Sequence, residues 1–113
     1  MVGLKIYKEG RLEGMLTITH RSFERYLILS RAHRLLACSP EHQQPGDQVL
    51  FELSGVMDRI LLKGMGKVPV TINGRNLDRV CVLIPGDIIQ VDQYRMIFLR
   101  LRESKTRLLD IVV

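Results

Sequence analysis

The fold of this chain is decided by the stretch VTINGRNL at residues 70–77, followed closely by LIPGDIIQV at residues 83–91. Asn73-Gly74 is the commonest pair for a two-residue β-hairpin turn, because both residues tolerate the positive φ that such turns require. In the second stretch, Pro85 sets φ for the first corner of a turn and Gly86 permits the second corner. Two turns this close together predict short strands joined in an antiparallel meander.

Strand-like segments recur on the N-terminal side of this region. Residues 3–8 alternate apolar and polar positions, and residues 15–19 carry β-branched side chains, so both segments predict strands. The apolar runs at 26–29 and 34–38 are compatible with either strand or helix. For residues 31–37 the helix propensity of the side chains favours a helix, whereas the β-rich context favours a strand. We favour the strand.

The second half of the chain continues the same pattern. A polar loop at 39–47, bounded by two prolines, leads into a strand at 49–53. Residues 94–102 alternate, which places Tyr94, Met96 and Phe98 on one side and predicts the last strand of a sheet. Pro-Gly-Asp occurs before two strands, and we attribute this to shared turn chemistry rather than to an internal repeat.

The length and composition indicate one globular domain spanning residues 1–113. The chain has 113 residues, 46% of them apolar, which is enough to build a core without a disulfide or metal. Aromatic residues make up only 5% and Trp is absent, which disfavours a stacking platform for single-stranded nucleic acid. The net charge of +5 favours anionic partners, although a basic solvated surface would give the same charge.

The two cysteines and the hydropathy pattern bear on the cellular compartment. Cys38 and Cys81 form no Cys-x-x-Cys motif, so we expect free buried thiols, with a disulfide as the open alternative. The N-terminus lacks the layout of a signal peptide, and no apolar run approaches the roughly 20 residues that span a bilayer. We therefore expect a cytoplasmic location and no membrane span within this chain.

No arrangement of reactive residues predicts an enzyme. The histidines at positions 20, 33 and 42 are scattered, and neither cysteine has a histidine at a meaningful spacing. Asp47 and Asp87 lie in turns, where aspartate is common. A Gly-rich phosphate loop and a metal-ligand cluster are both absent from the sequence. We expect no catalysis, no cofactor and no metal.

Four motifs in order along the chain resemble the forkhead-associated (FHA) domain. The family pattern is Gly-Arg-Ser, Ser-Arg-x-His, Asn-Gly-Thr-x-Val-Asn-Gly and Leu-x-x-Gly-Asp-x-Ile. The corresponding segments here are residues 20–22, 30–33, 68–74 and 83–89. The resemblance implies an all-β, FHA-like β-sandwich, which has eleven strands in the family. The sequence itself indicates about ten short, mainly antiparallel strands.

The resemblance also implies roles for individual residues. Phosphothreonine peptides bind the apical loops of FHA domains. Arg21 would help to bind the phosphate, Ser30 would hydrogen-bond it and Arg31 would be a neighbouring basic contact, a sensible donor set for a dianion. The residues with structural roles would be His33, Asn73, Gly74, Gly86 and Asp87.

The sequence departs from the family pattern at positions that matter for phosphothreonine. His20 replaces the usual glycine, and Val68-Pro69-Val70 stands where the family has the peptide-binding Asn-Gly-Thr. We therefore predict a degenerate, non-catalytic docking or scaffold module with residual phosphopeptide or anion binding. Its partner would be another protein, Thr-phosphorylated or not. Degenerate FHA domains are known in cytoplasmic parts of secretion machines, so such an assembly is one expected setting.

An RNA-binding module of the ribosomal-protein type is the alternative. In that hypothesis Ser30-Arg31 begins a basic helix that lies along phosphates, and the Asn-Gly hairpin follows it. Residues 37–69, which intervene, are longer than this arrangement needs, so nucleic acid is the less favoured partner. A helix over residues 31–37 would support the RNA hypothesis, whereas a strand would support the sandwich.

Overall fold

A computed structural model describes residues 2–18, 23–57 and 59–101. The described residues form eleven β-strands and one short 3-10 helix, η1. Their bounds are β1 Val2–Lys8, β2 Arg11–Ile18, β3 Phe23–Leu29, β4 Leu35–Cys38, η1 Pro40–His42, β5 Gln48–Val56, β6 Arg59–Gly64, β7 Val70–Ile72, β8 Arg75–Asn76, β9 Val80–Leu83, β10 Ile88–Val91 and β11 Tyr94–Arg100.

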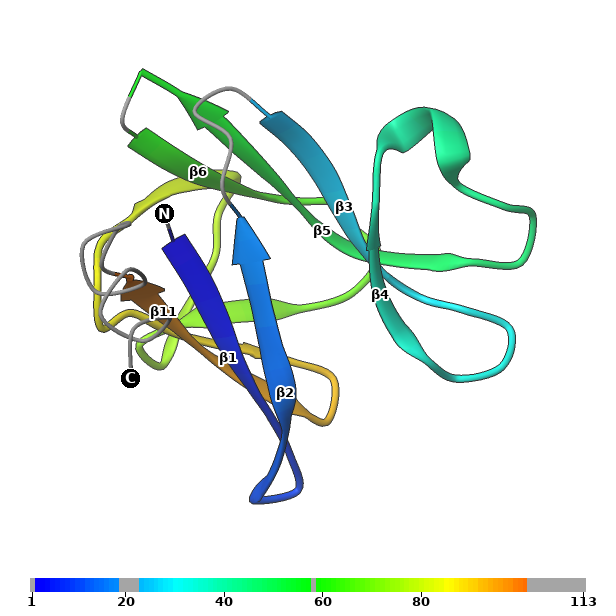
Figure 1. Cartoon of the computed structure of the whole chain (residues 1–113), viewed down its shortest axis with the longest axis horizontal. Helices are drawn as coiled ribbons and strands as arrows, with labels where there is room; N and C mark the ends of the chain where they lie inside the picture. The colour runs from blue at the N-terminus through cyan, green and yellow to red at the C-terminus, as the bar shows by residue number, and fades with distance from the viewer. Residues whose placement is uncertain (1, 19–22, 58, 102–113) are drawn as a thin grey trace, which may run out of the picture.

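The strands form two sheets that pack face to face (Figure 1). The six-stranded sheet has the order β2-β1-β11-β10-β7-β8, and the five-stranded sheet has the order β4-β3-β5-β6-β9. This confirms the predicted all-β sandwich. Residues 31–33 form a turn and β4 follows, so the helix that the RNA hypothesis requires does not form there.

The prediction of a simple antiparallel meander around the Asn-Gly turn is wrong. β7 and β8 pair as a hairpin, but β9 pairs with β6 in the other sheet. β10 then returns to lie between β7 and β11. The turn residues fix the local reversal of the chain, whereas the sheet that each short strand joins depends on which partner buries its apolar side.

The core lies between the two sheets and follows the alternation of the strands. On β11, Tyr94, Met96 and Phe98 are buried while Arg95 is exposed, as predicted. On β5 the alternation breaks at Leu50, which is buried next to buried Phe51 because the pairing with β3 shifts register there. The buried cluster consists of Leu4, Ile6, Leu27, Leu50, Phe51, Leu53, Leu62, Val70, Leu83, Ile89, Val91, Tyr94, Met96 and Phe98.

The cysteines are free and half-buried, rather than buried as expected. Cys38 lies on β4 and Cys81 on β9, which are the two opposite edges of the five-stranded sheet. Four strand spacings, about 19 Å, separate these edges, far beyond the reach of a disulfide within the chain. Burial is the main cause that raises the pKa of both thiols. In the described part of the chain, no helix has the length and apolarity needed to cross a membrane.

Candidate binding surface

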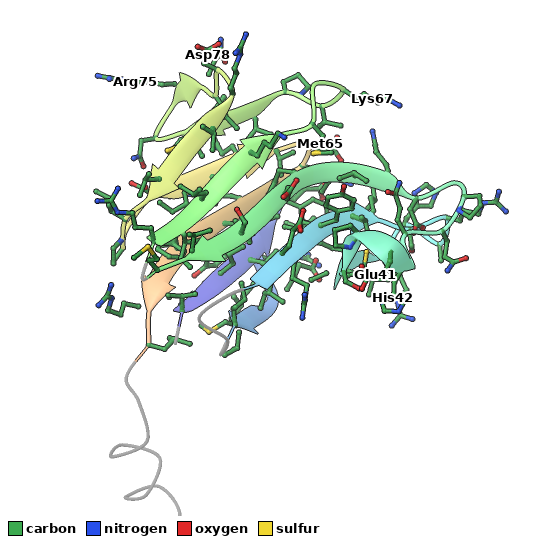
Figure 2. The ribbon with its side chains drawn as sticks, turned by 90° about the horizontal axis from the view of Figure 1, so that it is seen from above. Glu41, His42, Met65, Lys67, Arg75 and Asp78 are labelled. Carbon is green, nitrogen blue, oxygen red and sulfur yellow. The ribbon has the colours of Figure 1, made fainter. Side chains whose placement is uncertain are left out.

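Three loops emerge at one end of the five-stranded sheet. Leu29 at the end of β3 pairs with the start of β4 and the start of β5, so loops 30–34 and 39–47 meet at this end. β6 runs in the same direction as β3, because both are antiparallel to β5, and loop 65–69 follows it. Figure 2 shows Lys67 of loop 65–69 projecting toward the same side of the view as η1 of loop 39–47. We call these three segments the loop surface.

Loop 30–34 is closed by hydrogen bonds centred on Ser30. The Ser30 N–H donates to the Arg34 carbonyl oxygen at 2.9 Å, and the His33 N–H donates to the Ser30 carbonyl oxygen at 2.8 Å. The Ser30 Oγ accepts a third bond from the Arg34 N–H at 3.2 Å. Since the hydroxyl is used here as an acceptor, its own proton remains available for an anion.

The Arg31 side chain lies against Gly46 of the neighbouring loop. A Cβ added at Gly46 would overlap the Arg31 guanidine Nε, and it would also lie 2.9 Å from Cγ and 3.0 Å from Cδ. Gly46 has φ +91°, a conformation that favours glycine. A glycine at this position therefore supplies the space in which the Arg31 stem rests, and the two loops form one surface.

Loop 39–47 holds its shape through local hydrogen bonds. The Ser39 hydroxyl is hydrogen-bonded to His42 Nδ1 across η1. The Pro-Gly-Asp segment forms a turn in which the Asp47 N–H donates to the Gln44 carbonyl oxygen at 3.1 Å. In return, the Asp47 carboxylate accepts from the Gln44 N–H at 2.8 Å. These bonds fix Gly46, and with it the contact with Arg31.

His33 and Arg21 are the remaining residues that the resemblance assigns to this region. The His33 side chain is exposed and makes no hydrogen bond to another described residue, so His33 shapes the loop through its backbone, with φ +60°. Arg21 lies outside the described residues. The nearest described residue, Phe23, begins the seven-residue β3, and Ser30 follows its far end. About 23 Å of strand therefore separates Phe23 from Ser30.

Four of the predicted structural residues, Asn73, Gly74, Gly86 and Asp87, lie together in two turns that are joined by hydrogen bonds around the buried Asp87 carboxylate. Asn73 and Gly74 have φ +52° and +82° and form the tight turn between β7 and β8. Asn73 Nδ2 donates to Asp87 Oδ1 at 2.9 Å, and the Ile88 N–H donates to Asn73 Oδ1 at 2.9 Å. Asp87 Oδ2 accepts from the Ile84 N–H at 2.9 Å. The network ties the two decisive turns together, which the sequence order alone could not show.

A cleft beside loop 65–69 was missed by the sequence reasoning. It has a volume of about 560 Å³, and its lining includes Lys63, Lys67, Pro69 and Arg79. The Gly64 N–H donates to the Arg79 carbonyl oxygen at 3.0 Å, which brings the segment before β9 against the end of β6. No local motif signals this contact, because it joins segments from two different hairpins. The cleft adds two cationic side chains, Lys63 and Arg79, to the loop surface.

Among residues 2–18, 23–57 and 59–101, no group of three or more His, Cys, Asp or Glu side chains could hold a metal ion. The cationic side chains of the loop surface and the cleft are Arg31, Arg34, Lys63, Lys67 and Arg79, and the acidic ones are Glu41, Asp47 and Asp78. The arrangement of the loop surface suits an anionic group, because guanidinium and ammonium groups and a hydroxyl can all donate to phosphate or carboxylate oxygens.

No family model matches the sequence, and no curated protein matches it. Among solved structures, the chain is similar to the FHA domain of the CT664 protein from Chlamydia trachomatis, with a TM-score of 0.67 and 10% identity over 89% of this chain and 98% of that one. It is also similar to the FhaA FHA domain complexed with the intracellular domain of Rv3910, with a TM-score of 0.58 and 16% identity over 87% of this chain and 99% of that one. The chain therefore has the fold of an FHA domain.

Proposed function

We propose that this chain is a non-catalytic protein-docking module of FHA type, located in the cytoplasm. Its loop surface binds an anionic segment of another protein without selecting phosphothreonine over other anionic residues. A larger assembly, such as a secretion machine in which degenerate FHA domains occur, would be a suitable setting. In support of a protein partner, the FhaA FHA domain was solved in complex with part of another protein.

The observation that carries this proposal is the composition of the loop surface. Arg31 is held over Gly46, and Ser30, the preceding residue, has a hydroxyl whose proton is available, so this loop offers an anion two kinds of donor. Val68 in loop 65–69 and Val70 at the start of β7 stand where the family pattern has the hydrogen-bonding side chains of asparagine and threonine. A surface with these donors can recognise charge, but it lacks the side chains that would recognise the rest of a phosphothreonine peptide.

The test is a titration of labelled peptides followed by fluorescence anisotropy. Matched peptide libraries would carry phosphothreonine, phosphoserine, glutamate or threonine at one fixed position. We expect saturable binding of the three anionic sets with similar affinities. Since a hydrogen bond to a charged group contributes about 1.5–3 kcal/mol, Arg31→Ala should weaken binding roughly 10- to 100-fold. Ser30→Ala should weaken it less.

Arg75→Ala is the matched control, because it removes the same charge from β8, the exposed edge strand of the other sheet, on the side of the view opposite to Lys67 (Figure 2). We expect it to change affinity less than Arg31→Ala. A strong preference for phosphothreonine would overturn the proposed loss of specificity, and absence of binding to every anionic peptide would overturn the anion site. Steeply salt-dependent RNA binding that Arg31→Ala abolishes would favour the RNA alternative instead.

A further inference from the structure

The edge strand β9 carries a row of exposed apolar side chains. In the described part of the chain it pairs only with β6. Its side chains Val80 and Val82 are 56% and 46% exposed, and Ile84, directly after it, is 62% exposed. Neither a charged residue nor a proline interrupts residues 80–84, and the pairing with β6 contains no register shift. Such an edge is a template for pairing with another strand, which soluble proteins usually prevent.

The other edge strands are better protected. β2 alternates its exposed apolar residues with Arg11 and Glu13, and its pairing with β1 is interrupted by a register shift. β8 consists of the two polar residues Arg75 and Asn76. β4 exposes only one large apolar side chain, Leu36. β9 is therefore the edge at which burial of apolar surface would gain most.

The hydrogen-bond pattern shows which backbone groups of β9 are free. The Gly64 N–H donates to the Arg79 carbonyl oxygen at 3.0 Å, so Gly64 and Arg79 are a hydrogen-bonded pair between β6 and the chain entering β9. Backbone groups in an antiparallel strand point alternately to the two sides. Cys81 and Leu83 therefore bond to β6, and the N–H and C=O groups of Val80 and Val82 point outward, where the Val82 carbonyl oxygen accepts a long bond, 3.4 Å, from the Cys81 thiol and keeps its second lone pair for another donor.

We propose that β9 is a homodimerisation edge, at which two copies of this chain pair their β9 strands antiparallel about a two-fold axis. Val80 of each copy would form a hydrogen-bonded pair with Val82 of the second copy. Cys81 would lie on the axis, facing Cys81 of the second copy in a non-hydrogen-bonded pair. The two five-stranded sheets would then form one continuous sheet.

The register follows from the groups that are available. In the proposed register every free backbone group of Val80 and Val82 finds a partner. Centring the axis on Val82 would place Val80 opposite Ile84, whose N–H already donates to the Asp87 carboxylate at 2.9 Å. Centring it on Val80 would place Val82 opposite Asp78, a charged residue outside the strand. Both alternatives therefore lose hydrogen bonds or apolar contacts.

A second copy suits this edge because the edge is complementary to itself. In the proposed register Val80 packs beside Val82 of the second copy, and Leu61 on β6 lies beside Val82 within each copy. The charged residues at the start of the strand, Asp78 and Arg79, lie opposite the apolar positions 84 and 83 of the second copy, so no like charges oppose each other. Residues 80–84 carry no charged side chain, so they offer no ionic contact that would favour a strand of another protein over a second copy of this chain.

The first test measures the mass of the full chain by sedimentation equilibrium. An edge-to-edge contact buries less surface than the roughly 1,200–2,000 Å² of stable interfaces, so we expect weak association. The protein concentrations should therefore extend from about 10 µM to 1 mM. We expect the average mass to rise toward that of a dimer. Val82→Lys should keep the protein monomeric at every loading, since it buries a charge in the contact. Leu12→Lys, at a 58% exposed apolar site on β2, should dimerise as the wild type does.

Monomeric wild type over the whole range would overturn the proposal, as would a dimer that persists in Val82→Lys. The circular dichroism spectrum and the cooperative unfolding of both variants show whether each is folded. If Val82→Lys unfolds, Val80→Thr provides the second variant, because it keeps the β-branched shape while adding a polar group to the contact. It should weaken dimerisation several-fold, and an unchanged affinity would contradict the proposed contact.

The second test locates the axis by chemical cross-linking. A short bismaleimide joins two thiols by addition to each, so it needs no oxidant. We expect Cys38→Ser, which keeps Cys81, to give a covalent dimer as readily as the wild type, and Cys81→Ser to give none. Cross-linking through Cys38 alone would place the contact at the other edge of the sheet and overturn the proposal.

Hydrogen exchange tests whether another segment of the same chain covers the β9 edge. In the proposed dimer the Val80 and Val82 amides should be protected at high concentration and exchange freely at low concentration. Protection of these amides that does not depend on concentration would mean that another segment of the same chain occupies the edge, and this too would overturn the proposal.

Discussion

Asp87→Asn tests whether the buried network at the two decisive turns stabilises the fold. The chain provides an internal control, because it contains the same Pro-Gly-Asp turn twice. In each turn the aspartate carboxylate accepts from the backbone N–H three residues earlier, at 2.9 Å for Asp87 and at 2.8 Å for Asp47. Asp87 is only 6% exposed, and its second oxygen also accepts from Asn73. Asp47 is half-buried, and that single bond is its side-chain hydrogen bond in the described structure.

The expected magnitude follows from counting acceptors. An asparagine has one carbonyl oxygen, so at position 87 it can satisfy either Asn73 or the Ile84 N–H, and its NH₂ group must face the other donor. This loses a hydrogen bond to a charged, buried carboxylate, for a cost of about 2 kcal/mol. At position 47 an asparagine can turn its oxygen to the Gln44 N–H. The loss of charge alone should then cost less than about 1 kcal/mol.

Urea unfolding followed by circular dichroism measures both costs. With a slope of about 1–3 kcal/mol per molar urea, Asp87→Asn should lower the midpoint by about 0.7–2 M. Asp47→Asn should lower it by less than half as much, and neither change should alter the slope. Equal costs for the two variants, within about 0.5 kcal/mol, would refute the reasoning, because the extra acceptor role of Asp87 would then have no energetic consequence.

Two further predictions concern the outer face of the five-stranded sheet and the loop surface. Partial burial and the neighbouring Glu24 raise the pKa of Glu52. The folded protein therefore binds a proton at Glu52 more tightly than the unfolded chain does, so the free energy of unfolding should fall as the pH rises through the raised pKa. Glu52→Gln should remove this pH dependence and raise the free energy of unfolding at pH 7 by less than about 1 kcal/mol. Urea unfolding at several pH values measures both effects, and an unchanged pH dependence in the variant would contradict the prediction. Gly46→Ala and Gly74→Ala both place alanine at positive φ, at a cost of about 1–2 kcal/mol each. Only Gly46→Ala should also weaken anionic-peptide binding, because its methyl group displaces Arg31, and equal losses of affinity in both variants would exclude that contact.

The sequence was sufficient for features that depend on neighbouring residues. Asn73-Gly74 requires positive φ at two successive positions, and the structure has it there. The strand alternation predicted Tyr94, Met96 and Phe98 on one face, and all three are buried. These predictions succeed because turn geometry and side-chain alternation are set within a few residues of chain. The ambiguous segment 34–38 became a strand because β3 was available to pair with it.

The pairing of distant segments was decided by the tertiary structure. The sequence could not show that β9, which follows the β7–β8 hairpin, pairs with β6 in the other sheet. That choice depends on burying Leu83 in the core between the sheets. It could not show that Asn73 and Asp87 share a hydrogen bond, or that Gly46 makes room for Arg31. The sequence by itself thus determined the turns, the strands and the all-β class, since each follows from local backbone and side-chain chemistry. The order of strands, the hydrogen bonds around Asp87, the loop surface and the place of β9 at the edge of its sheet depend on contacts across many residues, which only packing of the two sheets establishes.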